Sequence, residues 1–122
     1  MPQFGVGVDI EAISRFKKSD AGGDSAFLKK VFTSLELDYC LSYKAPAQHL
    51  AARFAAKEAI IKAFGSLKRA GPDYRDIEIT NDSSGVPSAR ILRPGFEDLE
   101  IKLSLSHSRS EAIAFAVVTR TK

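Results

Sequence analysis

Residues 50–64 have the sequence LAARFAAKEAIIKAF and constrain the fold more than any other segment. At about 100° per residue, the large apolar side chains share one arc of a helix, and alanines occupy the opposite side. Arg53 and Lys57 fall inside the apolar arc. Glu58 lies at its edge, and Lys62 lies just beyond it. A surface helix keeps its charges opposite its apolar stripe, so we expect a central helix packed on most sides, whose charged residues need a specific explanation.

The rest of the chain predicts strands and short helices around that central helix. Thr33 followed by Glu36 has the spacing of a capping box, which marks a helix start. Pro46 suits the first turn of the long helix, and Gly65 suits its end. Strands are expected at 3–11, 75–80, 89–94, 100–106 and 112–119, and short helices at 12–18, 25–31 and 33–43. The fold class is therefore α+β: one domain, 1–122, with a mixed, largely antiparallel sheet packed around one long central helix.

Charge and composition exclude several classes of protein. The net charge of +3 suits an anionic ligand or an acidic partner, but it is too small for a duplex-DNA binder. The single cysteine, Cys40, excludes an internal disulfide and is expected to be a small core residue in a reducing compartment. No apolar run approaches the ~20 residues of a membrane span, and the start resembles no targeting signal. We expect a cytoplasmic protein that binds neither membrane nor nucleic acid.

Two acids end the first predicted strand. Asp9 and Glu11 are two residues apart, so their carboxylates point to the same face. Neighbouring carboxylates repel each other unless a cation lies between them or one is protonated. Mg²⁺ typically takes one or two such carboxylates and completes its coordination with water and substrate phosphate. The alternative is a solvated strand end whose acids precede the next helix.

Glu58 and Lys62 are spaced i, i+4 on the long helix. On an exposed face they would form an ion pair contributing about 0.3–0.5 kcal/mol. The surrounding alanine and apolar residues argue against such a face, and a half-satisfied buried charge costs several kcal/mol. The other interpretation is a polar cavity in which Glu58 meets a metal ion and the lysines meet phosphate. Glu36, in contrast, is expected to act only as the capping-box acid.

The segment LSLSHSRSEA places small hydroxyls and an imidazole at the end of a predicted strand. Ser106, His107 and Ser108 there can bind phosphate or ribose oxygens, whereas His107 can instead be a turn residue bonded to the backbone. No nucleophile-elbow pattern surrounds the serines, and no phosphate-gripping glycine pattern occurs in the chain. The segment therefore argues against a serine nucleophile.

Four motifs in this order resemble the 4′-phosphopantetheinyl transferases, and most of all the short holo-acyl-carrier-protein synthase type. They are G-V-D-I-E on the first strand, F-T-S-L-E at a helix start, R-F-A-A-K-E-A-I-I-K-A-F in the long helix, and S-L-S-H-S. The similarity runs from about residue 5 to residue 118. It implies the family's fold and the transfer of phosphopantetheine from coenzyme A to a serine of an apo acyl-carrier protein, releasing adenosine 3′,5′-bisphosphate. It also implies Mg²⁺, which Mn²⁺ can replace.

The resemblance implies roles for individual residues. Asp9 and Glu58 match the family's two Mg²⁺ ligands. Lys57 and Lys62 match its lysines associated with coenzyme A phosphates and catalysis, and Arg53 is expected to flank the same phosphates. For the transfer step we expect Glu58, acting with water, to take the proton of the carrier serine. The alternative acceptor is Lys62 in its neutral form.

Other implied roles lie outside the long helix. Ser106, His107 and Ser108 match the element that lines the family's nucleotide site. Arg15 lies where basic residues bind the acidic helix of the carrier protein. Glu11 departs from the short type, because many members place this acid three residues after the first. The shorter spacing resembles the longer transferases and the transferase domain of fungal fatty-acid synthases, and we expect Glu11 to be a third metal ligand, direct or through water.

The chain contains one copy of a unit that the long family members contain twice, with the substrate between the halves. A cleft with two walls must then be built from neighbouring subunits, and the resemblance to the short type implies a homotrimer with active sites at the subunit interfaces. Three competing interpretations are a metal-dependent nucleotide hydrolase, a purely structural trimer, and a module that binds RNA or another polyanion through Lys29, Lys30, Lys68 and Arg69. Carriers of fatty-acid and of polyketide synthesis both suit the sequence, as do a free-standing protein and a domain of a larger synthase.

Overall fold

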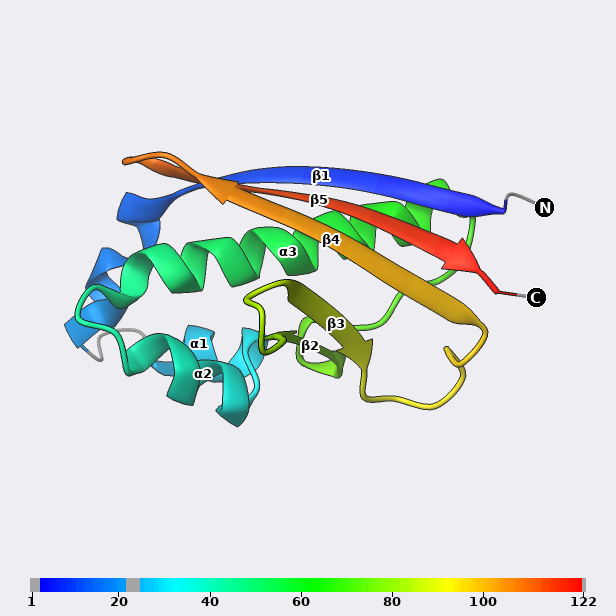
Figure 1. The fold of residues 1–122 in the computed structure, drawn as a ribbon. Coiled ribbons are helices and arrows are strands. Elements are labelled where there is room, and N and C mark those ends of the chain that lie inside the picture. Colours follow the sequence, from blue (N-terminus) through cyan, green and yellow to red (C-terminus); the bar gives the residue numbers. More distant parts are fainter. Residues whose placement is uncertain (1–2, 22–24, 122) are drawn as a thin grey trace.

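The computed structural model describes residues 3–21 and 25–121. Figure 1 shows one long helix with a sheet on one side and shorter elements on the other. In chain order the elements are β1 (Phe4–Ala12), the 3₁₀ helix η1 (Ile13–Ala21), α1 (Ser25–Val31), α2 (Ser34–Leu41), α3 (Pro46–Ser66), η2 (Tyr74–Asp76), β2 (Ile77–Asn81), β3 (Pro87–Ile91), β4 (Leu99–His107) and β5 (Glu111–Arg120).

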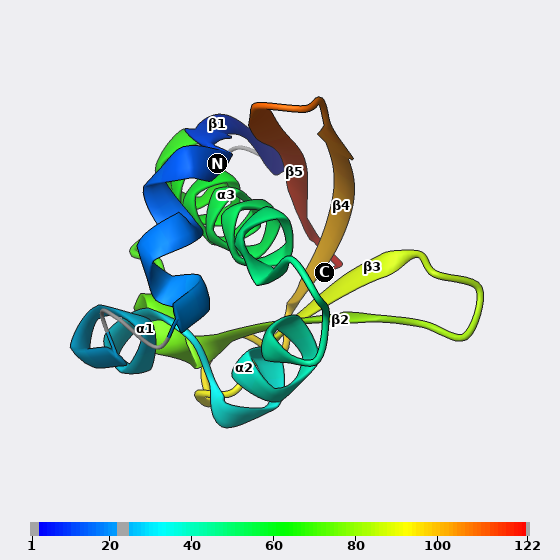
Figure 2. The same ribbon diagram turned by 90° about the vertical axis from the view of Figure 1, so that its left-hand side faces the viewer.

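The strands form two antiparallel sheets, which confirms the α+β class with antiparallel strands around a central helix. The larger sheet has the order β1-β5-β4, and β2 pairs with β3 as a hairpin. Figures 1 and 2 show the larger sheet over one side of α3, with α1, α2 and the hairpin on the other side. Most alanines of α3 are buried between these layers, as the helical pattern predicted, and Ala52 is half-buried.

The predicted elements are present, with differences at some boundaries. The segment after β1 is a 3₁₀ helix instead of an α-helix. Gly65 does not end the long helix, because α3 continues to Ser66 and the Leu67 amide still donates to the Ala63 carbonyl at 2.9 Å. The predicted capping box is present at Thr33 and Glu36. In the hairpin, β3 begins at Pro87, two residues earlier than expected.

Two glycines bring β1 into contact with the backbone of α3. A Cβ atom at Gly7 would lie 1.9 Å from the Ala59 carbonyl oxygen, and one at Gly5 would lie 2.0 Å from the Ala63 carbonyl oxygen. No side chain fits at either distance, so β1 can approach the helix this closely only with glycine at both positions. Asp9, two residues further along the strand, therefore lies beside the helix.

The outer surface of the larger sheet is apolar and exposed. We predicted residues 112–119 to be the more fully buried strand, but only one face of β5 is buried, where alanines pack on α3. Ile113 and Phe115 point the other way and pair in register with Ile10 and Val8 of β1. We call the exposed apolar residues of both strands the outer sheet face: Phe4, Val6, Val8, Ile10, Ile113 and Phe115. Within the described chain, no element lies over this face (Figure 1).

Cys40 lies in the core, as predicted, and burial raises the pKa of its thiol to about 12. A thiol with so high a pKa is inert as a nucleophile at neutral pH. Among the described helices, none is long and apolar enough to cross a membrane.

Candidate active site

Asp9 of β1 and Glu58 of α3 both lie close enough to Tyr74 of η2 for their charges to act on its hydroxyl, and Lys62 of α3 contacts Asp9. The Lys62 Nζ lies 3.4 Å from Asp9 Oδ1 and donates to the Val8 carbonyl at 3.1 Å. Lys62 follows Glu58 by one helical turn, so both side chains lie on the same side of α3. Of the three residues that the sequence assigned to catalysis, Lys62 therefore contacts Asp9 and lies one turn of α3 from Glu58.

Tyr74 of η2 also contacts this group, and the sequence analysis did not identify this residue. Its hydroxyl donates to Glu58 Oε2 at 2.9 Å. Burial, followed by the hydrogen bond and charge of Glu58 and the charge of Asp9, raises the pKa of Tyr74 to about 12. Tyr74 is thus a protonated donor at neutral pH that lies within electrostatic reach of both acids.

In the acid pair on β1, one carboxylate oxygen has no hydrogen-bond donor. Asp9 Oδ2 is buried and has no hydrogen-bond partner, and a buried carboxylate oxygen normally has one. Burial, together with a hydrogen bond to Asp9 and the charge of Asp9, raises the pKa of Glu11 to about 7. Both observations describe a site with an excess of negative charge, which a divalent cation would neutralise.

Glu11 is not a third direct ligand beside Asp9 and Glu58. Across residues 3–21 and 25–121, no three His, Cys, Asp or Glu side chains are grouped so that they could hold one metal ion. Glu11 Oε1 accepts instead from the Arg15 guanidinium at 2.9 Å. The structure thus gives Glu11 an ion pair with Arg15 and no place in a group of three direct ligands among the described residues, and a contact with the metal through water stays a prediction. Two carboxylates remain, a number that suits Mg²⁺ with water and phosphate as its other ligands.

Lys57 does not line the site, which corrects its predicted role in binding coenzyme A phosphates. Its side chain is 0% exposed, and its Nζ donates to the Val31, Tyr74 and Ile77 carbonyls at 2.6–2.9 Å. The same Nζ lies 2.7 Å from Glu36 Oε1. Burial lowers the pKa of Lys57, and the charge of Glu36 opposes this shift. The ammonium group therefore joins buried segments of the chain and has no donor left for a ligand.

Glu36 has a larger role than the capping function that we predicted. Its Oε1 accepts from the Thr33 amide at 2.8 Å, which completes the capping box. Its Oε2 accepts from the Ile79 amide at 2.7 Å, and the same carboxylate neutralises Lys57. The sequence contained a signal for this pairing, since a lysine inside an apolar arc requires a buried partner.

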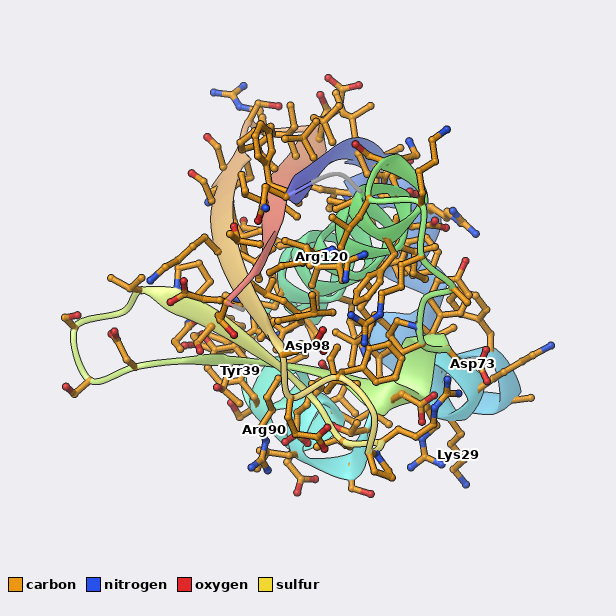
Figure 3. The ribbon with its side chains drawn as sticks, turned by 90° about the vertical axis from the view of Figure 1, so that its right-hand side faces the viewer. Lys29, Tyr39, Asp73, Arg90, Asp98 and Arg120 are labelled. Atoms are coloured by element: carbon orange, nitrogen blue, oxygen red, sulfur yellow. The ribbon has the colours of Figure 1, made fainter. Side chains whose placement is uncertain are left out.

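A cavity of about 330 Å³ lies between α3, the hairpin and the end of β4, and it contains three predicted ligand-binding residues: Arg53, Ser106 and His107. Arg53 is buried, its guanidinium lies 4.1 Å from the Tyr39 ring centre, and its Nε has no partner. Figure 3 shows Tyr39 at the base of the hairpin, where Asn81 donates to its hydroxyl at 3.0 Å. A buried, incompletely satisfied guanidinium at a cavity suits an anionic ligand.

The imidazoles beside this cavity are held by α2 and α3. His107 Nε2 lies 3.1 Å from Gln48 Nε2, so its ring is fixed against the start of α3. His49 stacks on Tyr43 at 3.8 Å, and burial lowers its pKa, as do the charges of Arg53 and His107. His49, Gln48 and Tyr39 also line the cavity, and none of them was predicted from the sequence.

Ser108 and Arg15 lie outside both groups. The Ser108 hydroxyl accepts from the Ser110 and Glu111 amides in the β4–β5 turn. Ser108 also lines a smaller cavity of about 220 Å³ with Ser106 and His107, and its contact with nucleotide stays a prediction. Arg15 is exposed, and its guanidinium lies over the Phe54 ring at 5.0 Å while it pairs with Glu11. An exposed, oriented guanidinium remains free to meet an acidic partner.

The basic residues of the polyanion interpretation do not form one patch. Arg69 pairs with Asp98 at 2.8 Å and donates to the Gly95 carbonyl. Figure 3 shows Asp98 close to Arg120, with which it also forms an ion pair at 4.0 Å, and well separated from Lys29 on α1. The charge of Arg69 is therefore already paired, and Lys29 lies on a different part of the surface.

The central helix α3, enclosed between the larger sheet and the layer of short helices and hairpin, carries Glu58 and Lys62 on one side and the arginine-lined cavity on another. These charges suit a phosphorylated substrate. Residues 5–118 match the family model of the 4′-phosphopantetheinyl transferase superfamily. The chain belongs to this superfamily, as the sequence motifs indicated.

Relatives of this chain include proteins named holo-acyl-carrier-protein synthase. One from Thermodesulfovibrio yellowstonii is 47% identical over 115 residues, covering 94% of this chain and 97% of the relative. One from a Geobacter species is 41% identical and covers 96% and 98%. Among solved structures, the synthase of Bacillus anthracis in complex with CoA (3′,5′-ADP) has a TM-score of 0.80 at 30% identity, with 98% and 99% covered. The Helicobacter pylori synthase in complex with coenzyme A has a TM-score of 0.79 at 27% identity, with 93% and 99% covered.

Proposed function

We propose that this protein transfers the 4′-phosphopantetheine group of coenzyme A to a serine of an apo acyl-carrier protein and releases adenosine 3′,5′-bisphosphate. The observation on which this proposal depends is the contact of Lys62 with Asp9, one helical turn from Glu58. A diphosphate and its counter-ion would lie beside this ion pair and the carboxylate of Glu58. The names of the relatives, which are holo-acyl-carrier-protein synthases, support the same reaction.

Asp9 and Glu58 would hold Mg²⁺, which Mn²⁺ can replace. The unpartnered, buried Asp9 Oδ2 and the pair of carboxylates fit a hard divalent cation. When bound, such an ion neutralises charge on the transferring diphosphate and on the leaving group. Lys62 and Arg53 supply further positive charge for the coenzyme A phosphates. The chain's own residues thus orient the substrate on both sides of α3.

In the transfer step, the serine oxygen of the carrier forms a bond to the β-phosphorus of coenzyme A. The bond from this phosphorus to the bridging oxygen breaks, and adenosine 3′,5′-bisphosphate leaves with the electron pair. The serine proton passes through a water molecule to Glu58, because a lysine beside phosphates stays protonated. Lys62 remains an ammonium group and stabilises the charge on the phosphates.

Intact-mass analysis of a carrier protein tests this function directly. Apo carrier protein, coenzyme A, Mg²⁺ and this protein are incubated, and we expect the carrier to gain the mass of one phosphopantetheine group. Release of bisphosphate without a carrier would indicate the nucleotide hydrolase instead. An unchanged carrier mass with all components present would contradict the proposal.

We propose a homotrimer whose active sites lie between subunits. Arg53 and Glu58 are five residues apart on α3, which corresponds to about 140° around the helix axis. The acids and the cavity therefore face different sides of one subunit, and one coenzyme A would contact both most simply where two subunits meet. The outer sheet face gives each subunit an apolar surface of the kind that mediates such assembly.

Phe115→Lys should convert the trimer into monomers and remove most transfer activity, because a charge then lies in the centre of the outer sheet face. Sedimentation velocity measures the assembly, and the intact-mass assay measures the activity. Leu92→Lys is the matched control, since Leu92 is 48% exposed and Phe115 is 46% exposed, but Leu92 lies outside that face. A wild-type chain that sediments as a fully active monomer would contradict the assembly.

Arg15 would contact the acidic helix of the carrier protein. Its exposed guanidinium, held over Phe54 and paired with Glu11, supports this role. The single, buried cysteine suits a reducing compartment and supports a cytoplasmic location.

A further inference from the structure

We propose that Tyr74 is a positioning residue that fixes the carboxylate of Glu58 for metal binding. This inference rests on the proposed function, since it assumes that Glu58 holds the divalent cation. The hydroxyl of Tyr74 donates to Glu58 Oε2 at 2.9 Å and is the hydrogen bond that the structure provides for this carboxylate. Glu58 is the metal ligand on α3, whereas Tyr74 belongs to the separate 3₁₀ helix η2.

The main chain of Tyr74 is anchored to the same helix. Lys57, the residue before Glu58, donates from Nζ to the Tyr74 carbonyl at 2.8 Å. Because Lys57 is buried and also bonds to the Val31 and Ile77 carbonyls, this anchor cannot move independently of the core. Lys57 therefore binds the carbonyl of Tyr74, and its neighbour Glu58 binds the hydroxyl of the same residue.

The ring of Tyr74 is fixed as well. It stacks on Phe54, with ring centres 5.6 Å apart and an interplanar angle of 28°. Phe54 belongs to α3, and the Arg15 guanidinium lies over its ring at 5.0 Å. With its carbonyl, ring and hydroxyl all held, Tyr74 is a rigid support, and its hydroxyl has one position relative to Glu58.

A rigid donor on one oxygen restricts the rotation of a carboxylate. Oε2 of Glu58 is engaged by Tyr74, so Oε1 is presented to a cation in one orientation. Groups that hold metal ligands in this way typically contribute 10–100-fold to metal affinity or activity. Tyr74 does not touch the substrate in this interpretation; it acts only through Glu58.

Tyr74→Phe tests the inference, because phenylalanine keeps the stacked ring and the anchored carbonyl and removes only the hydroxyl. We expect Mn²⁺, titrated alone and followed by electron paramagnetic resonance, to bind about tenfold more weakly. The Mg²⁺ concentration for half-maximal transfer should rise by a similar factor, while the KM for coenzyme A at saturating Mg²⁺ stays unchanged. The melting temperature shows whether the variant is folded.

Tyr43→Phe is the control for Mn²⁺ affinity, since it removes a hydroxyl that bonds to Tyr39 at 3.1 Å on another part of the surface. Native Mn²⁺ affinity and native Mg²⁺ dependence in Tyr74→Phe, together with weakened Mn²⁺ binding in Glu58→Gln, would overturn the inference and leave the proposed function intact. Native Mn²⁺ affinity in Glu58→Gln would overturn both, because Glu58 would then hold no metal.

Discussion

Glu58→Gln should abolish phosphopantetheine transfer and leave a folded protein. Glutamine keeps the size of the side chain and an oxygen that can accept from Tyr74, but it loses the negative charge that holds a cation and the basicity that accepts the serine proton. Loss of a general base typically costs about 10²–10⁴-fold, and loss of a metal ligand adds to this. Initial rates from the intact-mass assay measure the effect, and the melting temperature reports the fold.

The control is Glu97→Gln, which makes the same chemical change at an exposed acid in the β3–β4 connection. This variant should transfer phosphopantetheine at the native rate. Near-native turnover by Glu58→Gln would refute the assignment of Glu58 as base and ligand.

Lys57→Met should destabilise the protein by about 3–5 kcal/mol, because it leaves a buried carboxylate without its cation. The substitution keeps most of the side-chain volume, but Glu36 and three carbonyl oxygens lose their shared donor. Urea unfolding of the wild type and the variant gives the change in the free energy of unfolding.

Lys30→Met is the matched control at an exposed lysine of α1, and its free energy of unfolding should stay within about 0.5 kcal/mol of the wild type. The two roles considered for Lys57 predict different results. A phosphate-binding lysine would give a variant with native stability and a raised KM for coenzyme A, and that result would contradict the buried role.

Much of the fold could be predicted because its signals are local. The capping box at Thr33 and the alternation of β4 depend on residues close together in the chain, and both are present. The length of α3 was less certain from local signals, because a glycine such as Gly65 can sit inside a helix when tertiary packing holds that helix.

The sequence indicated the site residues whose charges recur in a local motif. It did not indicate residues whose partners lie far away in the chain. Lys62 contacts Asp9 and lies one helical turn from Glu58, and the catalytic roles of these three residues stay predictions. Lys57 was assigned to a ligand because its partner, Glu36, lies 21 positions away in the sequence and already had a capping role. Tyr74 was not predicted because a single aromatic residue in a predicted loop belongs to no sequence motif.

The two glycines of β1 determine how close this strand, which carries Asp9, lies to α3. The separation between strand and helix is fixed by main-chain atoms in contact at Gly5 and Gly7, and no deformable side chain lies between them. The distance from Asp9 to α3 is therefore set by main-chain atoms of the strand and the helix. A single added methyl group at Gly7 would meet the Ala59 carbonyl oxygen and push β1, together with Asp9, away from α3.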